Sequence, residues 1–327
     1  MRQSGDWPDP LGIRADSRRV VAAARNVRIS GAALERLADR LFSPAPDPPP
    51  WEGRYHWAGA PDQTANWLLA LDATNFCFWG NPRWEISFRG EVLSGYWGLA
   101  AALTRAVVEC GLPVWDAAYL ADLSDVDGRA IFAGTVEIPL LTRRIDHLRE
   151  AGQVVRDRFD GRFLNLGGAA GGDAGRVAAL VGDHFASFRD VAAYEGRPVR
   201  FFKRAQILAA DLVGAFGGQG PGALTGLEGL TAFADYKLPQ VLRHHGALVY
   251  SARLSQMIDE GTLLPAGSPA EVEIRAATIV AVDALAALSP RFSRAYRPFE
   301  VDWLLWQAGQ SLPPGVAPYH RTRTIYY

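Results

Sequence analysis

The segment 231–240 places a carboxylate among aromatic rings. Asp235 stands two residues after Phe233 and directly before Tyr236, and Pro239 favours the start of a helix here. A carboxylate in an aromatic pocket can stabilise a developing cation or activate water against it. The same side chain can cap the helix that follows, a role that needs no ligand. Both interpretations of Asp235 are open at this point.

A second carboxylate, Asp302, lies on a predicted helix over 299–310, next to Trp303. A charged residue on a helix usually lies on the solvated face. If Asp302 instead points inward, its burial requires a partner that donates N–H groups. Its surroundings therefore decide between a surface residue and a site residue.

Two cations begin another predicted helix, over 203–216. Lys203 and Arg204 follow Phe201 and Phe202, so both positive charges lie in the first turn. Cations in this position oppose the helix dipole, which costs some tenths of a kcal/mol unless an anion compensates. An internal carboxylate or a bound phosphate could be that anion, and a solvated first turn is the alternative.

Asn75 lies in a stretch, 71–80, that mixes polar groups with Phe76, Phe78 and Trp79. Its amide could hydrogen-bond the edge of a flat ligand while the rings stack on the ligand's face. The stretch could equally be ordinary core.

Other signatures of chemistry are weak. The glycine-rich run 167–175 lacks the Gly-Lys-Ser/Thr ending of a phosphate-binding loop, so we predict a flexible surface loop. The sequence contains neither a Gly-x-Ser-x-Gly elbow nor His-Glu-x-x-His. The six histidines are scattered, apart from His244 and His245, which cannot face one ligand from one side of a helix. We expect neither a metal site nor a cofactor.

The composition excludes several classes of protein. With 327 residues, 49% apolar and 21% charged, the chain can build a large core, which excludes disorder, collagen and coiled coil. Thirty-four basic and 35 acidic side chains leave a formal net charge of −1, which argues against duplex nucleic acid as the main partner. Aromatic residues make up 11%, and those not needed in the core could contact a ring-shaped ligand.

Cysteine content and the first residues bear on location. Two cysteines, Cys77 and Cys110, cannot form a disulfide framework and fit a reducing compartment. The polar segment 1–10 does not resemble a signal peptide, and no window holds about 18 uninterrupted apolar residues. We expect a cytoplasmic protein that does not bind membranes.

Helical periodicity dominates the chain. It predicts helices over 17–26, 30–42, 62–73, 95–111, 142–158, 176–187, 203–216, 238–246, 252–260, 269–288 and 299–310. Alternating apolar and polar residues predict one small β-hairpin near 84–93. Strands are too few for a doubly wound sheet, so we predict a mainly α fold, with residues 1–327 in a single large helical domain.

Several of these segments together resemble the queuosine salvage proteins, the queuosine 5′-phosphate N-glycosylase family. The matching segments, in order, are DPLGIR (9–14), NFCFW (75–79), SGYW (94–97), FRDV (188–191), FKRAQIL (202–208), FADYKLPQVL (233–242), EVEIR (271–275) and HRTRTIYY (320–327). No single segment is specific, but their combination over most of the chain is.

The resemblance implies hydrolysis of queuosine 5′-monophosphate to queuine and ribose 5-phosphate, as part of queuine salvage for tRNA modification. It also implies a fold similar to the helical DNA glycosylases, and a small-molecule substrate in place of a stable nucleic-acid complex. The family's catalytic aspartate falls on Asp235. The family's lysine falls on Lys203, which either orients Asp235 or holds the phosphate.

This chemistry suits the residues found. Breaking a ribosyl C–N bond places oxocarbenium character on C1′, which a nearby carboxylate stabilises. Queuine is a 7-deazaguanine and lacks the N7 that could be protonated to help the base leave, so hydrogen bonds to the departing base matter more. Phe233, Tyr236 and Phe76 are the candidates to stack on the base, at roughly 1–3 kcal/mol per contact.

Polar contacts to the substrate have their own candidates. Asp302 is the candidate acceptor for the N–H donors of the base, because a carboxylate only accepts. His56 and Asn75 are candidates for the base or its cyclopentenediol arm. Arg321 and Arg323 are candidates for the phosphate, although pairing with carboxylates that fasten the C-terminal segment is an alternative role.

Two other functions compete with this one. A base-excision glycosylase acting on DNA or RNA would use the same bond cleavage, but the net charge of −1 speaks against polymer binding. A non-catalytic carrier of queuine or a nucleoside would use the same aromatic pocket without Asp235 chemistry.

Overall fold

The computed structural model describes residues 7–327, which form 14 α-helices and three two-stranded antiparallel sheets. The predicted mainly α fold is confirmed. The prediction that segment 1–10 is not a signal peptide concerns residues 1–6 in part, and these lie outside the described residues. Contacts within the chain group into two compact units. The single domain over 1–327 stays a prediction.

The first unit contains residues 7–49, Asp190–Gln206 and Gly226–Arg323. Its elements are α1 (Ile13–Ala23), β1 (Val27–Ile29), α2 (Gly31–Phe42), β4 (Val191–Tyr194), β5 (Arg197–Arg200), α11 (Lys237–His244), β6 (Leu248–Tyr250), α12 (Ala252–Asp259), α13 (Pro269–Leu288) and α14 (Pro298–Gln310). Helix α10 (Lys203–Ala215) begins in this unit and continues in the second.

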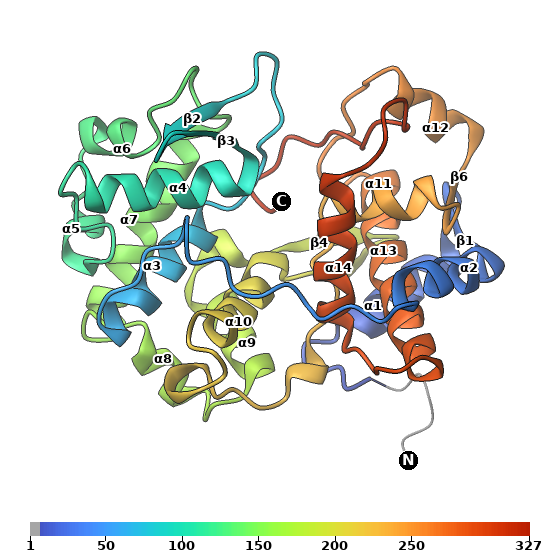
Figure 1. Cartoon of the computed structure of the whole chain (residues 1–327), viewed down its shortest axis with the longest axis horizontal. Coiled ribbons are helices and arrows are strands. Elements are labelled where there is room, and N and C mark those ends of the chain that lie inside the picture. The colour runs from blue at the N-terminus through green and yellow to red at the C-terminus, as the bar shows by residue number, and fades with distance from the viewer. Residues whose placement is uncertain (1–6) are drawn as a thin grey trace. The chain divides into compact units, whose positions relative to one another are not determined.

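Helix α13 is the core of the first unit. It packs against α1, α2, α11 and α14 and against strands β1 and β4 (Figure 1). A helix with neighbours on all sides is expected to be apolar throughout, yet α13 buries Glu271, Glu273 and Arg275. These charges need partners inside the protein, and each partner fixes another segment to α13.

The second unit contains Pro50–Arg189, Ile207–Thr225 and Thr324–Tyr327. Its elements are α3 (Pro61–Ala73), β2 (Glu85–Phe88), β3 (Glu91–Ser94), α4 (Gly95–Val108), α5 (Ala117–Ala121), α6 (Asp125–Ile131), α7 (Leu141–Arg158), α8 (Leu164–Ala169) and α9 (Ala174–His184). Helix α7 packs against α3, α5 and α6. A Cβ at Gly152 would collide with the backbone of α5, so this glycine permits the close approach of α5 and α7.

Most predicted elements are confirmed. The helix predicted over 269–288 has these bounds, and the hairpin near 84–93 is the pair β2 and β3, with Glu85 opposite Ser94. Two sheets were not predicted: the hairpin of β4 and β5, and the pairing of β1 with β6, which are far apart in sequence.

The glycine-rich run 167–175 is not the predicted surface loop throughout. Its first residues end α8, and Ala170 and Ala174 are fully buried. Gly171 and Gly172 then adopt positive φ, and the Asp173 carboxylate caps α9 by accepting the backbone N–H of Arg176 at 2.8 Å. Local capping, which the composition hides, orders this stretch.

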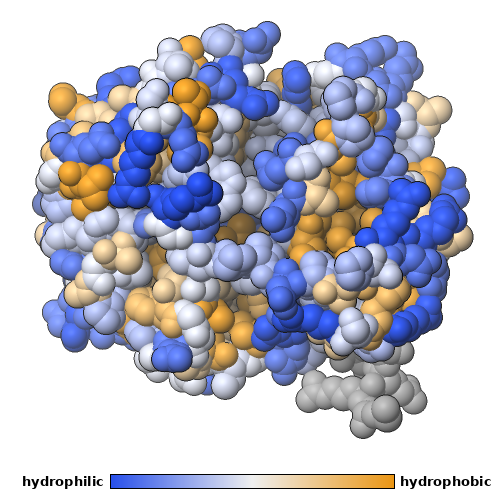
Figure 2. All heavy atoms as spheres, viewed as in Figure 1, coloured by the Kyte–Doolittle hydropathy of each residue, from blue (hydrophilic) through white to orange (hydrophobic). Residues whose placement is uncertain are grey.

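Hydrophilic and hydrophobic residues are interspersed over the face of the molecule shown in Figure 2. None of the helices formed by residues 7–327 combines the length and the apolar character of a membrane-spanning helix.

Glu273 of α13 holds the backbone that leads into β1. Its Oε2 accepts the N–H groups of Arg25, Asn26 and Val27 at 3.1, 2.6 and 3.2 Å, and its Oε1 accepts the Tyr194 hydroxyl at 2.9 Å. We predict that Glu273→Gln lowers the free energy of unfolding by about 2–4 kcal/mol, because an amide satisfies fewer of these donors. Urea unfolding measures this.

A matched control is Glu260→Gln, which makes the same change at an exposed position. It should alter the free energy of unfolding by less than about 0.5 kcal/mol. Equal stability of the two variants would contradict the role given to Glu273.

Candidate active site

The candidate site is built on segment 230–235, which is buried in the first unit and has no regular secondary structure. Buried backbone groups need partners, and here side chains supply them. Arg14 of α1, itself 1% exposed, donates to the carbonyls of Gly229 and Leu230 at 2.9 and 2.8 Å. Gln206 of α10 accepts the Thr231 N–H at 2.8 Å.

The end of this segment is held by two further side chains. The Phe233 N–H donates to Asp302 of α14 at 2.7 Å. The Ala234 carbonyl accepts the Nε–H of Arg275 of α13 at 3.2 Å. Asp235, the next residue, thus follows a stretch of backbone whose position is set by α1, α10, α13 and α14.

Asp235 caps helix α11. Its Oδ1 accepts the N–H groups of Lys237 and Leu238 at 2.7 and 3.0 Å, so the structural interpretation of this residue is confirmed. The residue is only 9% exposed. Among the hydrogen bonds of the described residues, none involves Oδ2, so capping leaves one carboxylate oxygen available to a ligand.

Asp302 points inward. It is 3% exposed, and the Phe233 N–H is the kind of donor that its burial requires. Burial, and then the negative charge of Asp235, raise the pKa of Asp302 to about 8. Without a ligand, Asp302 is therefore mostly protonated at neutral pH and carries an O–H donor, which differs from the purely accepting carboxylate predicted for it.

Lys203 lies within electrostatic reach of both carboxyl groups. Burial raises the pKa of Asp235, and the charge of Lys203 is the strongest of the influences that lower it. Lys203 also acts to lower the pKa of Asp302. An internal carboxyl group, Asp235, thus lies within electrostatic reach of Lys203 in the first turn of α10, which agrees with one of the sequence interpretations.

The C-terminal part of the first unit contacts Tyr236 and Gln240, which follow Asp235 in sequence. Tyr236 contacts Tyr319, with ring centroids 4.8 Å apart, and the amide of Gln240 donates to the Ala317 carbonyl at 3.0 Å. His320 is 2% exposed, and burial lowers its pKa to about 3, so it is neutral.

The predicted phosphate ligands Arg321 and Arg323 are exposed. A backbone hydrogen bond holds the C-terminal segment at this point, since the Arg321 carbonyl accepts the Leu264 N–H at 2.8 Å. No ion pair of Arg321 occurs among the described residues. Their role toward phosphate stays a prediction.

The other predicted contacts, His56, Asn75 and Phe76, belong to the second unit. The Glu52 carbonyl can only accept, so His56 carries its proton on Nδ1 and its Nε2 accepts the Tyr96 hydroxyl at 2.9 Å. Burial lowers the pKa of His56 to about 4. Its ring stacks on Trp51, with centroids 4.2 Å apart. A ligand that bonds this neutral imidazole must displace Tyr96.

Arg144 of α7 holds the stretch around Asn75 and Phe76. Its guanidinium donates to the carbonyls of Thr74, Phe76 and Cys77 and lies 4.4 Å from the centroid of the Phe76 ring. Phe76 is 1% exposed and Asn75 5%. These contacts favour a core role for Phe76, because one face of its ring is covered, and its stacking on a base stays a prediction.

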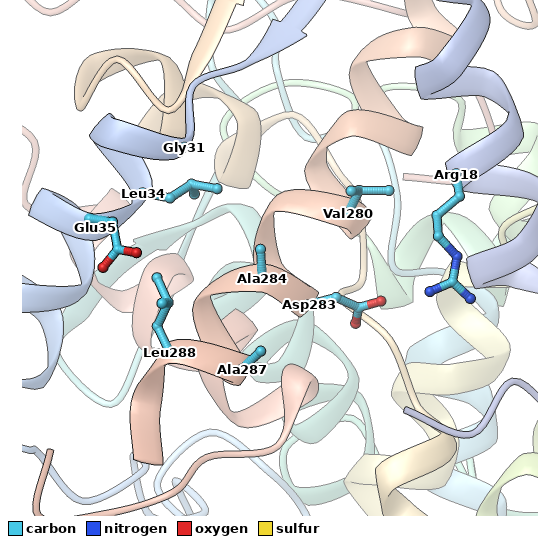
Figure 3. A pocket seen from close by; sticks show the side chains of 9 residues that line it. All are labelled: Arg18, Gly31, Leu34, Glu35, Val280, Asp283, Ala284, Ala287 and Leu288. Carbon is cyan, nitrogen blue, oxygen red and sulfur yellow. The ribbon is translucent and has the colours of Figure 1, made fainter. Parts of the chain in front are cut away.

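A cavity of about 390 Å³ lies among α1, α2 and α13 and contains none of the predicted site residues. Figure 3 shows Arg18 from α1 and Asp283 from α13 at one end, with Leu34 and Glu35 from α2 at the other. Asp283 is paired with Arg14 at 3.0 Å, and burial raises its pKa to about 6.

Within residues 7–327, no cluster of His, Cys, Asp or Glu is arranged to hold a metal ion.

Three residues near Asp235 were not predicted from the sequence. Arg275 donates to the Ala234 carbonyl, Asp190 pairs with Arg275, and Tyr319 contacts Tyr236. Asp190 and Arg275 lie in segments noted only for family resemblance, and Tyr319 drew no attention. An aspartate and an arginine that stand apart in sequence give no periodic signal of their pairing. For Arg275, a cation one turn after Glu271 in a largely apolar helix was the available clue.

The chain is similar to known proteins over nearly its whole length. Residues 55–327 match the family described as queuosine salvage protein. A Sphaerobacter thermophilus protein named queuosine 5′-phosphate N-glycosylase/hydrolase is 50% identical over 322 residues, covering 98% of this chain and 99% of that protein. Proteins of the same name from Mus musculus and Schizosaccharomyces pombe are 33% and 30% identical, covering 97% and 89% of this chain and 99% and 91% of their own.

The proximity of the two carboxyl groups can be tested by titration. In Asp235→Asn the negative charge that helps raise the pKa of Asp302 is lost, so this pKa should fall below about 8 and remain above the ordinary 3.8 because burial persists. The ¹³Cγ shift of Asp302, followed against pH by NMR, measures it. Asp283 serves as the internal control and should titrate as in the unaltered protein; an unchanged Asp302 would refute the coupling.

Proposed function

Because the chain belongs to the queuosine salvage protein family, we propose that it is a hydrolase that cleaves the N-glycosidic bond of queuosine 5′-monophosphate. The products are queuine and ribose 5-phosphate, and queuine becomes available for tRNA modification. The observation that supports this chemistry best is the buried carboxyl pair of Asp235 and Asp302 with Lys203 in electrostatic reach.

Asp235 is the catalytic carboxylate in this proposal. As the C1′–N bond breaks, positive charge develops on C1′ and the ring oxygen, and an oriented anion stabilises it. Oδ1 is fixed by two N–H groups of α11, so Oδ2 is the atom that faces the sugar. Water then adds its oxygen to C1′, and the proton that it releases neutralises the departing base, which gives ribose 5-phosphate and queuine.

Lys203 keeps Asp235 ionised. Burial alone would favour the protonated acid, which could not stabilise a cation. The ammonium group opposes that effect by its charge, and the two capping N–H groups do so by hydrogen bonding. Lys203 therefore acts first on Asp235 in this proposal, and Arg321 and Arg323 are the proposed cations for the phosphate.

Asp302 recognises the base. The guanine-like edge of queuine offers N–H donors, which favour the ionised carboxylate over the acid. Binding of the base thus releases the proton that Asp302 holds in the free protein. Phe233, 4% exposed, and Tyr236 provide the aromatic contacts in the same segment. His56, Asn75 and Phe76 are the further proposed contacts.

Incubation with three substrates, followed by mass spectrometry, tests the function. We expect queuine from the mononucleotide and no cleavage of intact tRNA, with the free nucleoside as the third substrate. Cleavage of tRNA but not of the mononucleotide would favour a polymer glycosylase. No cleavage of any substrate, with queuine bound, would favour a carrier.

Asp235→Asn is the sharpest variant, because asparagine retains an oxygen that can cap α11. We predict that turnover of the mononucleotide falls at least about a hundredfold, while queuine binding remains measurable by calorimetry. The control is Asp259→Asn, which breaks only a surface ion pair with Arg243 and should leave turnover unchanged. Undiminished turnover in Asp235→Asn would refute the assignment.

Queuine affinity tests Asp302. Because the ionised form binds the base, affinity should rise up to about tenfold between pH 7 and pH 9, as the group with a pKa of about 8 loses its proton. Asp302→Asn should remove this dependence while still accepting the Phe233 N–H. Asp302→Ala should weaken binding by about 1–3 kcal/mol. Affinity that falls with pH in the unaltered protein would show Asp302 acting as a donor.

A further inference from the structure

Arg275 links the two segments that carry Lys203 and Asp235. Its Nη1 and Nη2 donate to Oδ1 and Oδ2 of Asp190 at 2.9 and 2.5 Å, and its Nε donates to the Ala234 carbonyl at 3.2 Å. The side chains of Arg275 and Asp190 are 2% and 3% exposed. One planar group therefore holds a carboxylate on one segment and a backbone carbonyl on the other.

Asp190 fixes the start of α10. Its Oδ2 also accepts the Lys203 N–H at 3.3 Å, and its backbone carbonyl accepts the N–H groups of Phe201 and Phe202 at 3.0 and 3.2 Å. Phe202 has a φ of 45°, in the left-handed region that a bulky residue adopts only when its surroundings impose it. Asp190 thus holds the backbone directly before Lys203 in one conformation that is unfavourable for Phe202.

Stability alone does not require an ion pair between Arg275 and Asp190 at this buried position. A buried ion pair contributes little more to stability than apolar side chains of the same volume, because its desolvation offsets the attraction. What apolar side chains cannot supply is direction, since the guanidinium donates at fixed angles in one plane. The centroid of the Phe201 ring lies 3.9 Å from the guanidinium carbon of Arg275, so this ring covers one face of the guanidinium group.

We infer that the Arg275–Asp190 ion pair is the positioning element that sets Lys203 against Asp235. Lys203 follows the held Phe202 by one residue, and Asp235 follows the held Ala234 by one residue. Neither Arg275 nor Asp190 touches the substrate in this scheme. The inference rests on the proposed function, in which Lys203 maintains the ionised state of Asp235.

The test uses Arg275→Lys, which keeps the charge and loses the fork, and Asp190→Asn, which keeps the shape and loses the charge. Hydrolysis of queuosine 5′-monophosphate is measured between pH 4 and pH 9, with kcat referred to the concentration of queuine-binding sites. We expect kcat to fall about 10- to 100-fold in both variants, the scale of an ångström-sized misplacement, with KM within roughly twofold.

The pH profile separates positioning from simple loss of stability. The charge of Lys203 lowers the pKa of Asp235, so a displaced Lys203 lets this pKa rise. The acid limb of the kcat profile should therefore move to higher pH in both variants. Destabilisation alone lowers the number of active sites without moving this limb.

Tyr194→Phe is the matched control, because it removes a buried hydrogen bond to Glu273 on the same helix, α13. It should lower the Tm and leave kcat and the acid limb unchanged. A variant pair with unaltered kcat and acid limb would overturn the inference. So would a pair that forms no queuine-binding sites, since the ion pair would then serve folding. An inactive unaltered protein that binds queuine would instead overturn the proposed function.

Discussion

The site depends on one constraint: segment 230–235 is buried and has no helix or strand to satisfy its backbone. Each unpaired N–H or C=O group there would cost about 1–3 kcal/mol. The protein meets this cost with buried polar side chains, Arg14, Gln206, Arg275 and Asp302. Charged groups therefore lie along this segment because folding requires them, and Asp235, at the end of the segment, lies near these groups.

The same constraint separates the ionisation of the two carboxyl groups. Asp302 must stay at Phe233 to satisfy its N–H group, which keeps it close enough to Asp235 for the two charges to repel. Lys203 and the first N–H groups of α11 lower the pKa of Asp235 against the effect of burial, whereas Asp302, with a pKa of about 8, retains its proton at neutral pH. Pairs of titratable groups with separated pKa values are typical of acid–base and glycosidic chemistry.

Local patterns predicted most of the fold. Apolar spacing predicted helices over 30–42 and 203–216, and the structure has α2 and α10 within one residue of these bounds. The pairing of Asp190 with Arg275, 85 residues away, could not be predicted, because no periodicity in either segment reports a contact that only the tertiary fold creates. The pairing of β1 with β6 escaped prediction for the same reason.

The two interpretations of Asp235, helix cap and catalytic carboxylate, support each other. The N–H groups of Lys237 and Leu238 fix Oδ1 and favour the charged form, as does the positive end of the helix dipole. A carboxylate that is held, ionised and left with one unengaged oxygen needs no reorganisation when a cation develops beside it, which is the condition for electrostatic catalysis. The cap thus favours the ionised form of an aspartate whose burial favours the acid.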